Sequence, residues 1–365
     1  MVPTSSTKES ECFVHERIDE EDKPKIRSNV CFDSANYEYE GDYYCLLHYP
    51  NNKKINDFTK AFYKRLGLEK YDFRGVWFPT KLKFPAKIYK SKVNFRYATF
   101  ASKAKFKDTI FEAEADFLKA TFLADANFDR TRFCKKVDFY KTIFRAGAYF
   151  EDAVFVGEAH FCTTTFSAEA SFEKSTFLSK ANFDSAKFLE SSEIFFKDTK
   201  FREKVDFHYA VFAGYVLFEG DKDNQVFLKN SFMDLRDARL NNPERINFHR
   251  VGLRPNWFIN TDCRKFIFTD IEEFTKINIK SELESLNTRG IKNSKQLFKI
   301  ACRQLAENAE NNNRFEEASN FRRMAFECEN LEKKAEIAEN KKNLQIIGNE
   351  FDISKSFDEI VIKSE

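Results

Sequence analysis

The sequence predicts a mainly β protein: a long β-solenoid, preceded by a small Cys/His module and followed by an α-helical hairpin. Phenylalanine supplies 44 of the 365 residues, where an ordinary globular chain is rich in Leu, Ala and Gly. From Phe95 to Phe188 the Phe residues follow one another at alternating steps of five and six. Two residues before each Phe stands a small or β-branched residue, so the repeated unit is small-x-Phe. An internal repeat of this kind predicts a solenoid.

The repeat fits strands rather than a helix. In a helix, which turns about 100° per residue, a step of five residues turns the chain by roughly 140°, so successive Phe would lie on different faces. In an extended segment, residues two apart point to the same side, so the small residue and its Phe both face inward. The residue between them is usually polar, as at Lys105, Asp116 and Asn127. Each unit therefore predicts one very short strand and a turn.

Four units are expected to close one coil of the chain. A coil then takes about 22 residues, and successive coils lie about 4.8 Å apart. Phe residues at equivalent positions should form four stacked columns, one of which holds Phe95, Phe117, Phe139, Phe161 and Phe183. After Phe188 we expect a two-residue insertion at 193–196, a loop at 220–225 and degenerate coils that include Phe258. The solenoid should end near Phe274, after about eight coils at this interstrand spacing.

These repeats resemble those of the pentapeptide-repeat proteins, whose unit is small-polar-Phe/Leu-x-x. The resemblance implies a right-handed quadrilateral β-helix. The extra residue in alternate units departs from the family pattern and suggests that two of the four corners are wider. The resemblance supplies no biochemical role, because many proteins of this family have none known.

The first 48 residues hold the candidate metal ligands. Cys12, His15, Cys31, Cys45 and His48 concentrate there and include two Cys-x-x-His pairs. Such spacing lets two side chains reach one tetrahedral Zn²⁺, and a metal stabilises a segment too small for a core. Residues 44–50 also resemble a Tyr-Cys-x-x-His-x-Pro pattern of this branch of the family. We predict one structural zinc ion on Cys12, Cys31, Cys45 and His48, with His15 as the alternate ligand; the competing interpretation is an unligated, mobile surface segment.

The flanks of the repeat are expected to close its two ends. Phe58, Phe62 and Leu66 have helical spacing, and the aromatic residues from Tyr71 to Phe84 suit a plug on the first coil. After Lys276, helical spacing on either side of Asn311–Asn313 predicts a hairpin with a weak resemblance to a tetratricopeptide repeat; its apolar positions include Phe315 and Phe326. The expected parts are a Cys/His module at 1–55, a cap at 56–90, the β-helix at 91–275, the hairpin at 276–345 and a tail at 346–365, either a partner-binding strand or a frayed end.

The sequence points away from catalysis. Phosphate-binding glycine motifs and the G-x-S-x-G nucleophile motif are missing from the sequence. His160, His208 and His249 fall at polar or turn positions of the repeat, and Cys134 and Cys162 directly follow an inward Phe. We therefore expect no catalytic residues and no enzyme.

Charge and composition leave two non-enzymatic functions open. The formal net charge is +2, and residues 91–220 carry equal numbers of acidic and basic side chains, so no direct nucleic-acid binding is expected. The polar start, the lack of a long apolar run and the scattered Cys favour a cytoplasmic protein without a membrane segment. We expect a scaffold or adaptor with an unidentified protein partner and an open oligomeric state. The alternative, implied by the family resemblance, is a DNA mimic that regulates a topoisomerase or another nucleic-acid enzyme.

Overall fold

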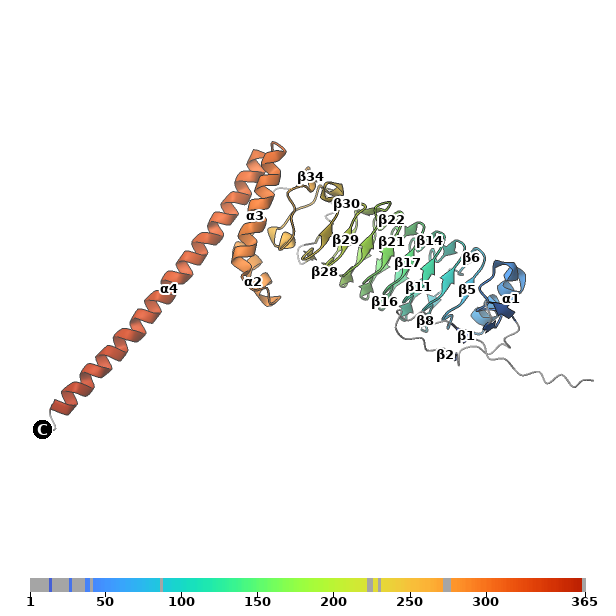
Figure 1. Ribbon diagram of the computed structural model, residues 1–365, viewed down its shortest axis with the longest axis horizontal. Helices are drawn as coiled ribbons and strands as arrows, with labels where there is room; N and C mark the ends of the chain where they lie inside the picture. The colour runs from blue at the N-terminus through green and yellow to red at the C-terminus, as the bar shows by residue number, and fades with distance from the viewer. Residues whose placement is uncertain are drawn as a thin grey trace, which may run out of the picture. The chain divides into compact units, whose positions relative to one another are not determined.

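The computed structural model describes residues 13–14, 26–27, 37–39, 42–85, 88–221, 226–228, 231–271 and 277–362. The chain forms two compact units. Unit 1 comprises Met1–Leu253 and Lys265–Glu273, and unit 2 comprises Arg254–Arg264 and Phe274–Glu365. Unit 1 contains the parallel β-solenoid, whose short strands stack in succession (Figure 1). Among the described helices, none has the length and apolar character that a membrane span requires.

The solenoid advances by one coil every 22 residues over its regular part. Ala104 pairs with Ala126, and Ala126 pairs with Ala148, both in parallel. A regular coil contributes four two-residue strands, so the solenoid has four faces, which we number in chain order. This arrangement confirms the predicted four-unit coil.

The four faces are parallel sheets of six to nine strands. Face 1 consists of β8 (Val93–Asn94), β12 (Ala115–Asp116), β16 (Val137–Asp138), β20 (Ala159–His160), β24 (Ala181–Asn182), β28 (Lys204–Asp206) and β31 (Phe232–Asp234). Face 2 consists of β5 (Trp77–Phe78), β9 (Thr99–Phe100), β13 (Thr121–Phe122), β17 (Ile143–Phe144), β21 (Thr165–Phe166), β25 (Lys187–Phe188), β29 (Val211–Phe212) and β32 (Arg239–Leu240). Face 3 consists of β6 (Leu82–Lys83), β10 (Ala104–Lys105), β14 (Ala126–Asn127), β18 (Ala148–Tyr149), β22 (Ala170–Ser171), β26 (Glu193–Lys197), β30 (Tyr215–Glu219), β33 (Ile246–His249) and β34 (Ile267–Thr269). Face 4 consists of β7 (Ile88–Tyr89), β11 (Ile110–Phe111), β15 (Arg132–Phe133), β19 (Val154–Phe155), β23 (Thr176–Phe177) and β27 (Lys200–Phe201).

The core is the predicted set of Phe columns. The rings of Phe117 and Phe139 stack with centroids 4.9 Å apart, as do those of Phe139 and Phe161. Phe128 meets Phe139 edge to face at 5.5 Å, so rings from different columns interlock across the interior. At several coils where the small residue is Thr, its hydroxyl bonds to the backbone: Thr164 Oγ1 donates to the carbonyl oxygen of Phe139 at 2.7 Å.

The solenoid begins inside the segment expected to be only a cap, with a parallel bridge between Asp72 and Asn94 and then β5 at Trp77. Phe78, Phe84 and Tyr89 continue the steps of six and five into Phe95, with Tyr in place of Phe, so a pattern read from Phe alone misses the first coil. Before it lies α1 (Ile55–Gly67), in which Phe58, Phe62 and Leu66 are buried as predicted. The Phe62 ring contacts Phe78 and Phe84 at 5.8 and 5.1 Å. The helix therefore covers the aromatic core at the start of the solenoid.

The irregular parts of the solenoid follow the sequence in one place and depart from it in another. Ala170 pairs with Ile194, which confirms the two-residue insertion, and Phe196 stacks on Phe172 at 5.1 Å. The expected loop at 220–225 lies mostly outside the described residues. Residues 254–264, which include Phe258, belong to unit 2 rather than to a degenerate coil. Two short 3-10 helices interrupt this region, η2 (Pro243–Arg245) and η3 (Pro255–Phe258).

Unit 2 is helical, with α2 (Ile279–Thr288), α3 (Ser294–Asn311) and α4 (Phe315–Ile362). The α3–α4 hairpin is as predicted, whereas α2 is an additional helix and α4 runs on through the expected tail. Asn308 Nδ2 donates to the carbonyl oxygens of Cys263 and Arg264 at 3.1 and 2.9 Å, which ties residues 254–264 to α3.

Phe315 and Phe326 lie in α4, as their helical spacing predicted, but they do not face α3. They are 66% and 62% exposed, whereas Ala318, Phe321 and other small or apolar residues of α4 are buried. A helix turns about 100° per residue, so Phe326 lies well away from the stripe that these buried residues form.

The N-terminal part contains β1 (Phe13–Val14) paired with β2 (Ile26–Arg27), and β3 (Tyr37–Tyr39) paired with β4 (Asp42–Tyr44). A short 3-10 helix, η1 (Asn52–Lys54), leads from it into α1.

Candidate interaction surfaces

The turn after β4 brings two of the predicted metal ligands together. Cys45 is fully buried and His48 is 6% exposed. Cys45 Sγ lies 3.1 Å from His48 Nδ1. His48 Nε2 lies 2.9 Å from the carbonyl oxygen of Arg74, and because a carbonyl only accepts, Nε2 carries the proton that it donates. The imidazole therefore presents Nδ1 to the sulfur.

The Cys45 thiol and the His48 imidazole could supply two of the four ligands of a structural zinc site. A thiolate and an imidazole nitrogen are common zinc ligands, and a ligating imidazole usually donates its other N–H to a carbonyl or carboxylate. Zinc bonds of about 2.3 Å to sulfur and 2.0 Å to nitrogen would set the two atoms about 3.5 Å apart, a few tenths of an ångström more than observed. Cys12, Cys31 and the alternate His15 lie outside the described residues. Within the described ranges, no three His, Cys, Asp or Glu side chains are grouped as they would be around a metal ion.

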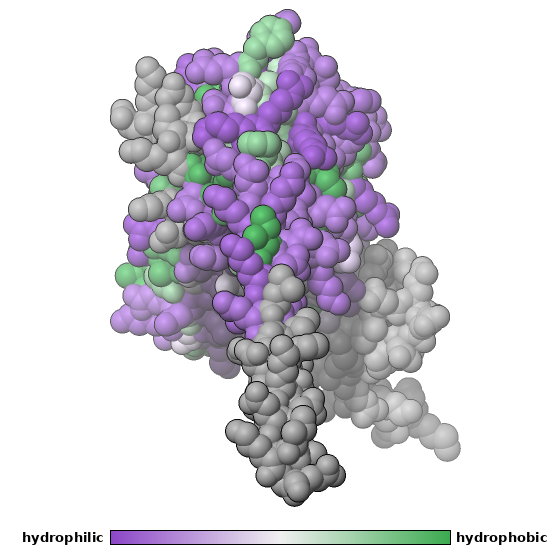
Figure 2. All heavy atoms as spheres, turned by 90° about the vertical axis from the view of Figure 1, so that its left-hand side faces the viewer, coloured by the Kyte–Doolittle hydropathy of each residue, from purple (hydrophilic) through white to green (hydrophobic). Residues whose placement is uncertain are grey.

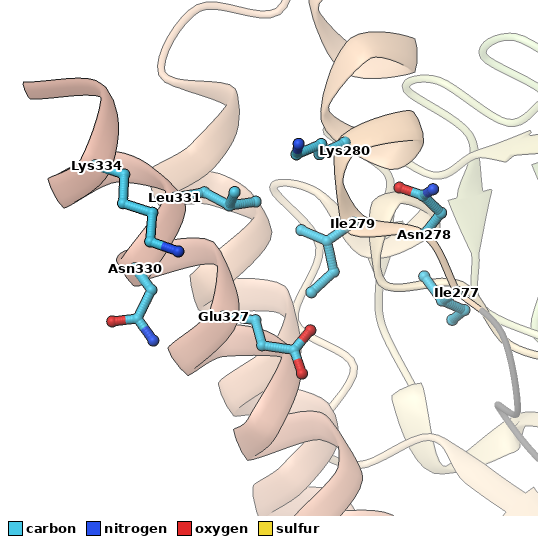
Figure 3. Close-up of a pocket in the computed structure, with 8 residues that line it drawn as sticks. All are labelled: Ile277, Asn278, Ile279, Lys280, Glu327, Asn330, Leu331 and Lys334. Atoms are coloured by element: carbon cyan, nitrogen blue, oxygen red, sulfur yellow. The ribbon is translucent and has the colours of Figure 1, made fainter. Parts of the chain in front are cut away.

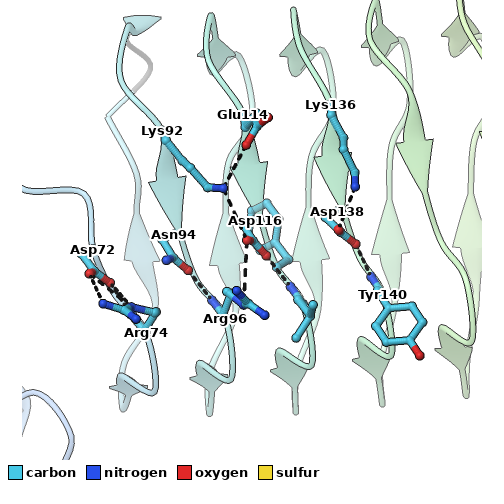
Figure 4. Close-up of polar contacts among 12 residues, drawn as sticks. Asp72, Arg74, Lys92, Asn94, Arg96, Glu114, Asp116, Lys136, Asp138 and Tyr140 are labelled. Carbon is cyan, nitrogen blue, oxygen red and sulfur yellow. Dashed lines mark hydrogen bonds and ion pairs between the residues drawn. The ribbon is translucent and has the colours of Figure 1, made fainter. Parts of the chain in front are cut away.

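Face 1 carries a ladder of short polar side chains (Figure 4). An oxygen of each accepts the backbone N–H two residues ahead, as Asp116 does from Leu118 at 3.1 Å and Asp138 from Tyr140 at 2.9 Å. The same bond recurs along the face at Asn94, Asn182, Asp206 and Asp234. These residues therefore stabilise the turns of the coil, and this structural role explains why they recur at the same position of the repeat.

Charges on face 1 are paired within and between coils. Lys92 Nζ lies 2.9 Å from Glu114 in the next coil, and Lys204 Nζ lies 3.0 Å from Asp234. Burial opposes ionisation of Asp234, but the hydrogen bond from Arg236 and the charge of Lys204 outweigh it and lower its pKa to about 2. Both signs alternate along the rod, so this face presents no field of one sign.

Face 2 is different because its outward positions are almost free of charge. Successive coils place Thr99, Thr121, Ile143 and Thr165 before the inward Phe, and Ala101, Leu123, Arg145, Ser167 and Leu189 after it. Leu123 and Leu189 are 39% and 38% exposed. Arg145, Lys187 and Arg239 are exposed cations along this face, and none of the three forms an ion pair with any described residue. Face 2 is thus a surface of mostly uncharged side chains, with three cations that have no ion-pair partner among the described residues.

Sequence reasoning missed face 2 because charge was summed over the whole repeat. The signal was present: outward positions of one face recur every 22 residues, so sorting the charges by their position within the coil separates face 2 from face 1.

Unit 2 contains an open groove between the start of α2 and the middle of α4 (Figure 3). Ile277, Ile279 and Leu331 supply its apolar floor. Lys280, Lys334 and Glu327 stand around it with Asn278 and Asn330. Asn278 caps α2 by accepting the N–H of Ser281 at 3.2 Å. The groove mixes both signs of charge and selects no ligand class.

The remaining candidate residues have structural partners. His160 lies 2.9 Å from Glu158, and His208 lies between Asp184 and Asp237. Burial and the Asp184 charge raise the pKa of the Cys162 thiol to about 11. At neutral pH this thiol is protonated, a poor nucleophile. Figure 2 shows that one face of the molecule is mainly hydrophilic, with hydrophobic residues in small separate groups.

The fold defines a parallel β-solenoid with four faces. A family model for pentapeptide repeats, described as nine copies, matches residues 90–132. The strands that flank this segment keep the same coil and the same inward Phe. Residues 90–132 are thus pentapeptide repeats by sequence, and the solenoid built around them continues the same coil. No curated protein and no solved structure matches it.

Proposed function

We propose that this protein is a non-enzymatic scaffold that binds a protein partner through face 2. The observation that carries the proposal is the outward surface of face 2, where mostly uncharged side chains surround Leu123 and Leu189 and the three cations lack ion-pair partners in the described structure. A flat, weakly charged surface is inexpensive to desolvate on binding. The three cations favour an acidic partner, since complementary charge speeds and orients association.

The DNA-mimic alternative receives less support from the described surface. A mimic needs negative charge along the rod, whereas the acids of face 1 pair with Lys92, Lys204 and other cations. At the turns between faces 3 and 4, Asp108, Arg130, Asp152, Lys174 and Asp198 occupy equivalent positions and alternate in sign. Arg130 pairs with Asp108 at 2.6 Å. Because these acidic and basic side chains pair with each other, the surface lacks the continuous negative charge that a DNA mimic needs.

Affinity capture with matched variants tests the scaffold proposal. We expect L123E/L189E, which places two charges on face 2, to lose a protein that the wild type retains. Ile88 on face 4 is 47% exposed, so Ile88→Glu changes a similar side chain elsewhere on the solenoid and should retain the same protein. Arg145→Glu should weaken retention most at low salt. An identical set of captured proteins from all of these variants would exclude face 2 as the binding surface.

We also propose that Cys12, Cys31, Cys45 and His48 hold one structural zinc ion, with His15 as the alternate ligand. The support is the Cys45–His48 pair and the N–H that His48 donates to Arg74. Bound zinc would hold the N-terminal segment together, which is a folding role and needs no open coordination position.

A further inference from the structure

One side of α4 carries large apolar side chains at intervals of eleven residues. Phe315, Phe326 and Ile337 are 66%, 62% and 56% exposed. Eleven residues make about three turns of helix and leave a drift of only about 20°, so the three side chains lie nearly on one line. We call them the α4 stripe.

The α4 stripe faces neither of the helices that pack on α4. Cys328, which is fully buried, belongs to the side that meets α3, and it lies about 160° around the helix from Phe326. Leu331 lines the groove toward α2 and is about 140° away. The α4 stripe is therefore a third, unoccupied side of the helix within unit 2.

We propose that two copies of this chain associate through the α4 stripe, with the two α4 helices antiparallel and the symmetry axis at Phe326. The even spacing makes the α4 stripe complementary to itself in this register. Phe326 packs on Phe326 of the second copy, and Phe315 packs on Ile337 at both ends. An eleven-residue period also keeps two helices in contact with little supercoiling.

Charge selects the antiparallel orientation. In a parallel pair the two flanks of the stripe meet at equal heights, which sets Arg322 against Arg323 and Lys333 against Lys334, and like charges repel. In the antiparallel pair each flank meets itself in reverse. Arg322 then lies beside Glu329 of the second copy, because the two are seven residues apart on the same flank and nearly equidistant from Phe326. Glu316 likewise lies beside Lys334 of the second copy, because the two residues are on the same flank, eighteen residues apart, and nearly equidistant from Phe326.

These side chains also have contacts within their own chain. Arg322 pairs with Glu310, and Glu329 with Lys333 at 3.0 Å. Both are surface pairs, which contribute little stability and exchange easily. The association therefore requires little rearrangement of these pairs. It goes beyond the proposed scaffold function, because face 2 belongs to unit 1 and the α4 stripe to unit 2.

Sedimentation velocity of the full chain tests the association. We expect a concentration-dependent dimer that Phe326→Glu and Ile337→Glu convert to monomer, with unchanged circular dichroism because both side chains are exposed. Ile346 provides a matched control: it is 52% exposed on the same helix and lies half a turn around from Ile337. Ile346→Glu should leave the dimer intact. A monomeric wild type, or a dimer that resists Phe326→Glu, would overturn the proposal and leave the stripe to a different chain.

Disulfide trapping tests the orientation. Phe326→Cys should cross-link to itself under mild oxidation, and a mixture of Phe315→Cys and Ile337→Cys chains should form mixed dimers, with the linked peptides identified by mass spectrometry. Ile337→Cys alone should not cross-link through residue 337, whereas a parallel pair would do so readily. Arg322→Glu should weaken the dimer, and R322E/E329R should restore it; failure of that rescue would contradict the antiparallel register.

Discussion

Each inward Phe is held by rings above, below and beside it. Phe139 is fully buried between Phe117 and Phe161, and it meets Phe128 and Phe150 edge to face. The small-x-Phe spacing predicted these columns because side-chain direction alternates along a strand regardless of the wider fold. The residue type that each position of a column requires can therefore be predicted from the sequence alone.

Phe139→Asp should unfold the solenoid or make it aggregate. Replacing a buried Phe by Ala already costs about 3–5 kcal/mol, and the carboxylate adds the cost of a buried charge. Thermal unfolding followed by circular dichroism measures the effect. Asp138→Asn is the adjacent control and should be nearly silent, because Asn keeps the oxygen that accepts the Tyr140 N–H. Equal melting of Phe139→Asp and wild type would refute the inward-Phe arrangement.

The turns were less predictable than the strands. In each regular coil a non-glycine residue adopts positive φ at two turns, one after face 1, as at Lys141 (55°) and Thr163 (57°), and one after face 3, as at Asp152 (54°). Gly is the usual residue at such a position, yet the repeat uses Lys, Asp, Arg and Thr there. Residue type therefore gave no signal for this conformation.

Thr163→Gly should raise the free energy of unfolding. The left-handed backbone conformation costs a non-glycine residue about 1–2 kcal/mol, and a β-branched residue more, so Gly removes this strain from the folded state. Gly also makes the unfolded chain more flexible, which lowers the free energy of unfolding by about 0.4–1 kcal/mol. We expect a net gain of about 1 kcal/mol, measured by denaturant unfolding. Thr165→Gly, in a strand of the same coil, should be destabilising. A loss of stability in Thr163→Gly would show that the Thr side chain contributes more than its backbone strain costs.

Asp234 should make the solenoid sensitive to acid. Its pKa is lowered to about 2 from an unfolded value near 3.9, so its ionised form contributes stability at every pH above about 4. That contribution, about 2–3 kcal/mol by linkage, is lost as the pH falls from about 4 through 2. Asp234→Asn should be destabilised near neutral pH and lose less stability over this acid window. Parallel pH profiles of the two proteins would contradict the assignment.

The helices outside the repeat were predicted less completely than the repeat itself. The helical spacing of Phe58, Phe62 and Leu66 predicted α1, whose apolar side is buried. α2 was not predicted, although Ile279, Leu283 and Leu286 have the i, i+4, i+7 spacing of its buried side, because a ten-residue helix gives a shorter pattern than the helices after residue 294. Helical spacing placed Phe315 and Phe326 in a helix, but their exposure could not be predicted, because such spacing identifies an apolar stripe without saying which stripe is covered.

The N-terminal metal element can be tested directly. Native mass spectrometry of the full chain should show one zinc ion that a chelator removes, with a lower melting temperature after removal. Cys45→Ser should bind no zinc. Cys134→Ser is the control, because Cys134 lies in the regular solenoid on face 4, and it should bind zinc like the wild type. A chain that carries no metal under any of these conditions would leave the Cys45–His48 contact as a simple thiol–imidazole hydrogen bond.

At the scale of the whole molecule, the chain passes between its two units more than once. Residues 254–264 leave the solenoid for unit 2, and residues 265–273 return to supply β34. A repeat pattern could not reveal this excursion, because Phe258 and Phe268 keep a plausible spacing while only one of them lies in a solenoid strand. The boundary expected from composition, with the β-helix ending at 275 and the hairpin beginning at 276, therefore falls inside unit 2. It assigns residues 254–264 to the β-helix.

This excursion predicts that a chain ending at residue 276 keeps its solenoid but loses the packing of residues 254–264. Trp257 is 1% exposed in η3, which contacts α3, and Asn308 of α3 supplies the hydrogen bonds to Cys263 and Arg264. The chain has two Trp residues, so the substitution Trp77→Phe isolates the signal of Trp257. We expect the truncated protein to keep its β-type circular dichroism while Trp257 emission shifts to the red and trypsin cleaves at Arg264. The full-length Trp77→Phe chain should show neither change. Unchanged emission in the truncated chain would mean that the solenoid itself buries Trp257, and residues 254–264 would then belong to unit 1.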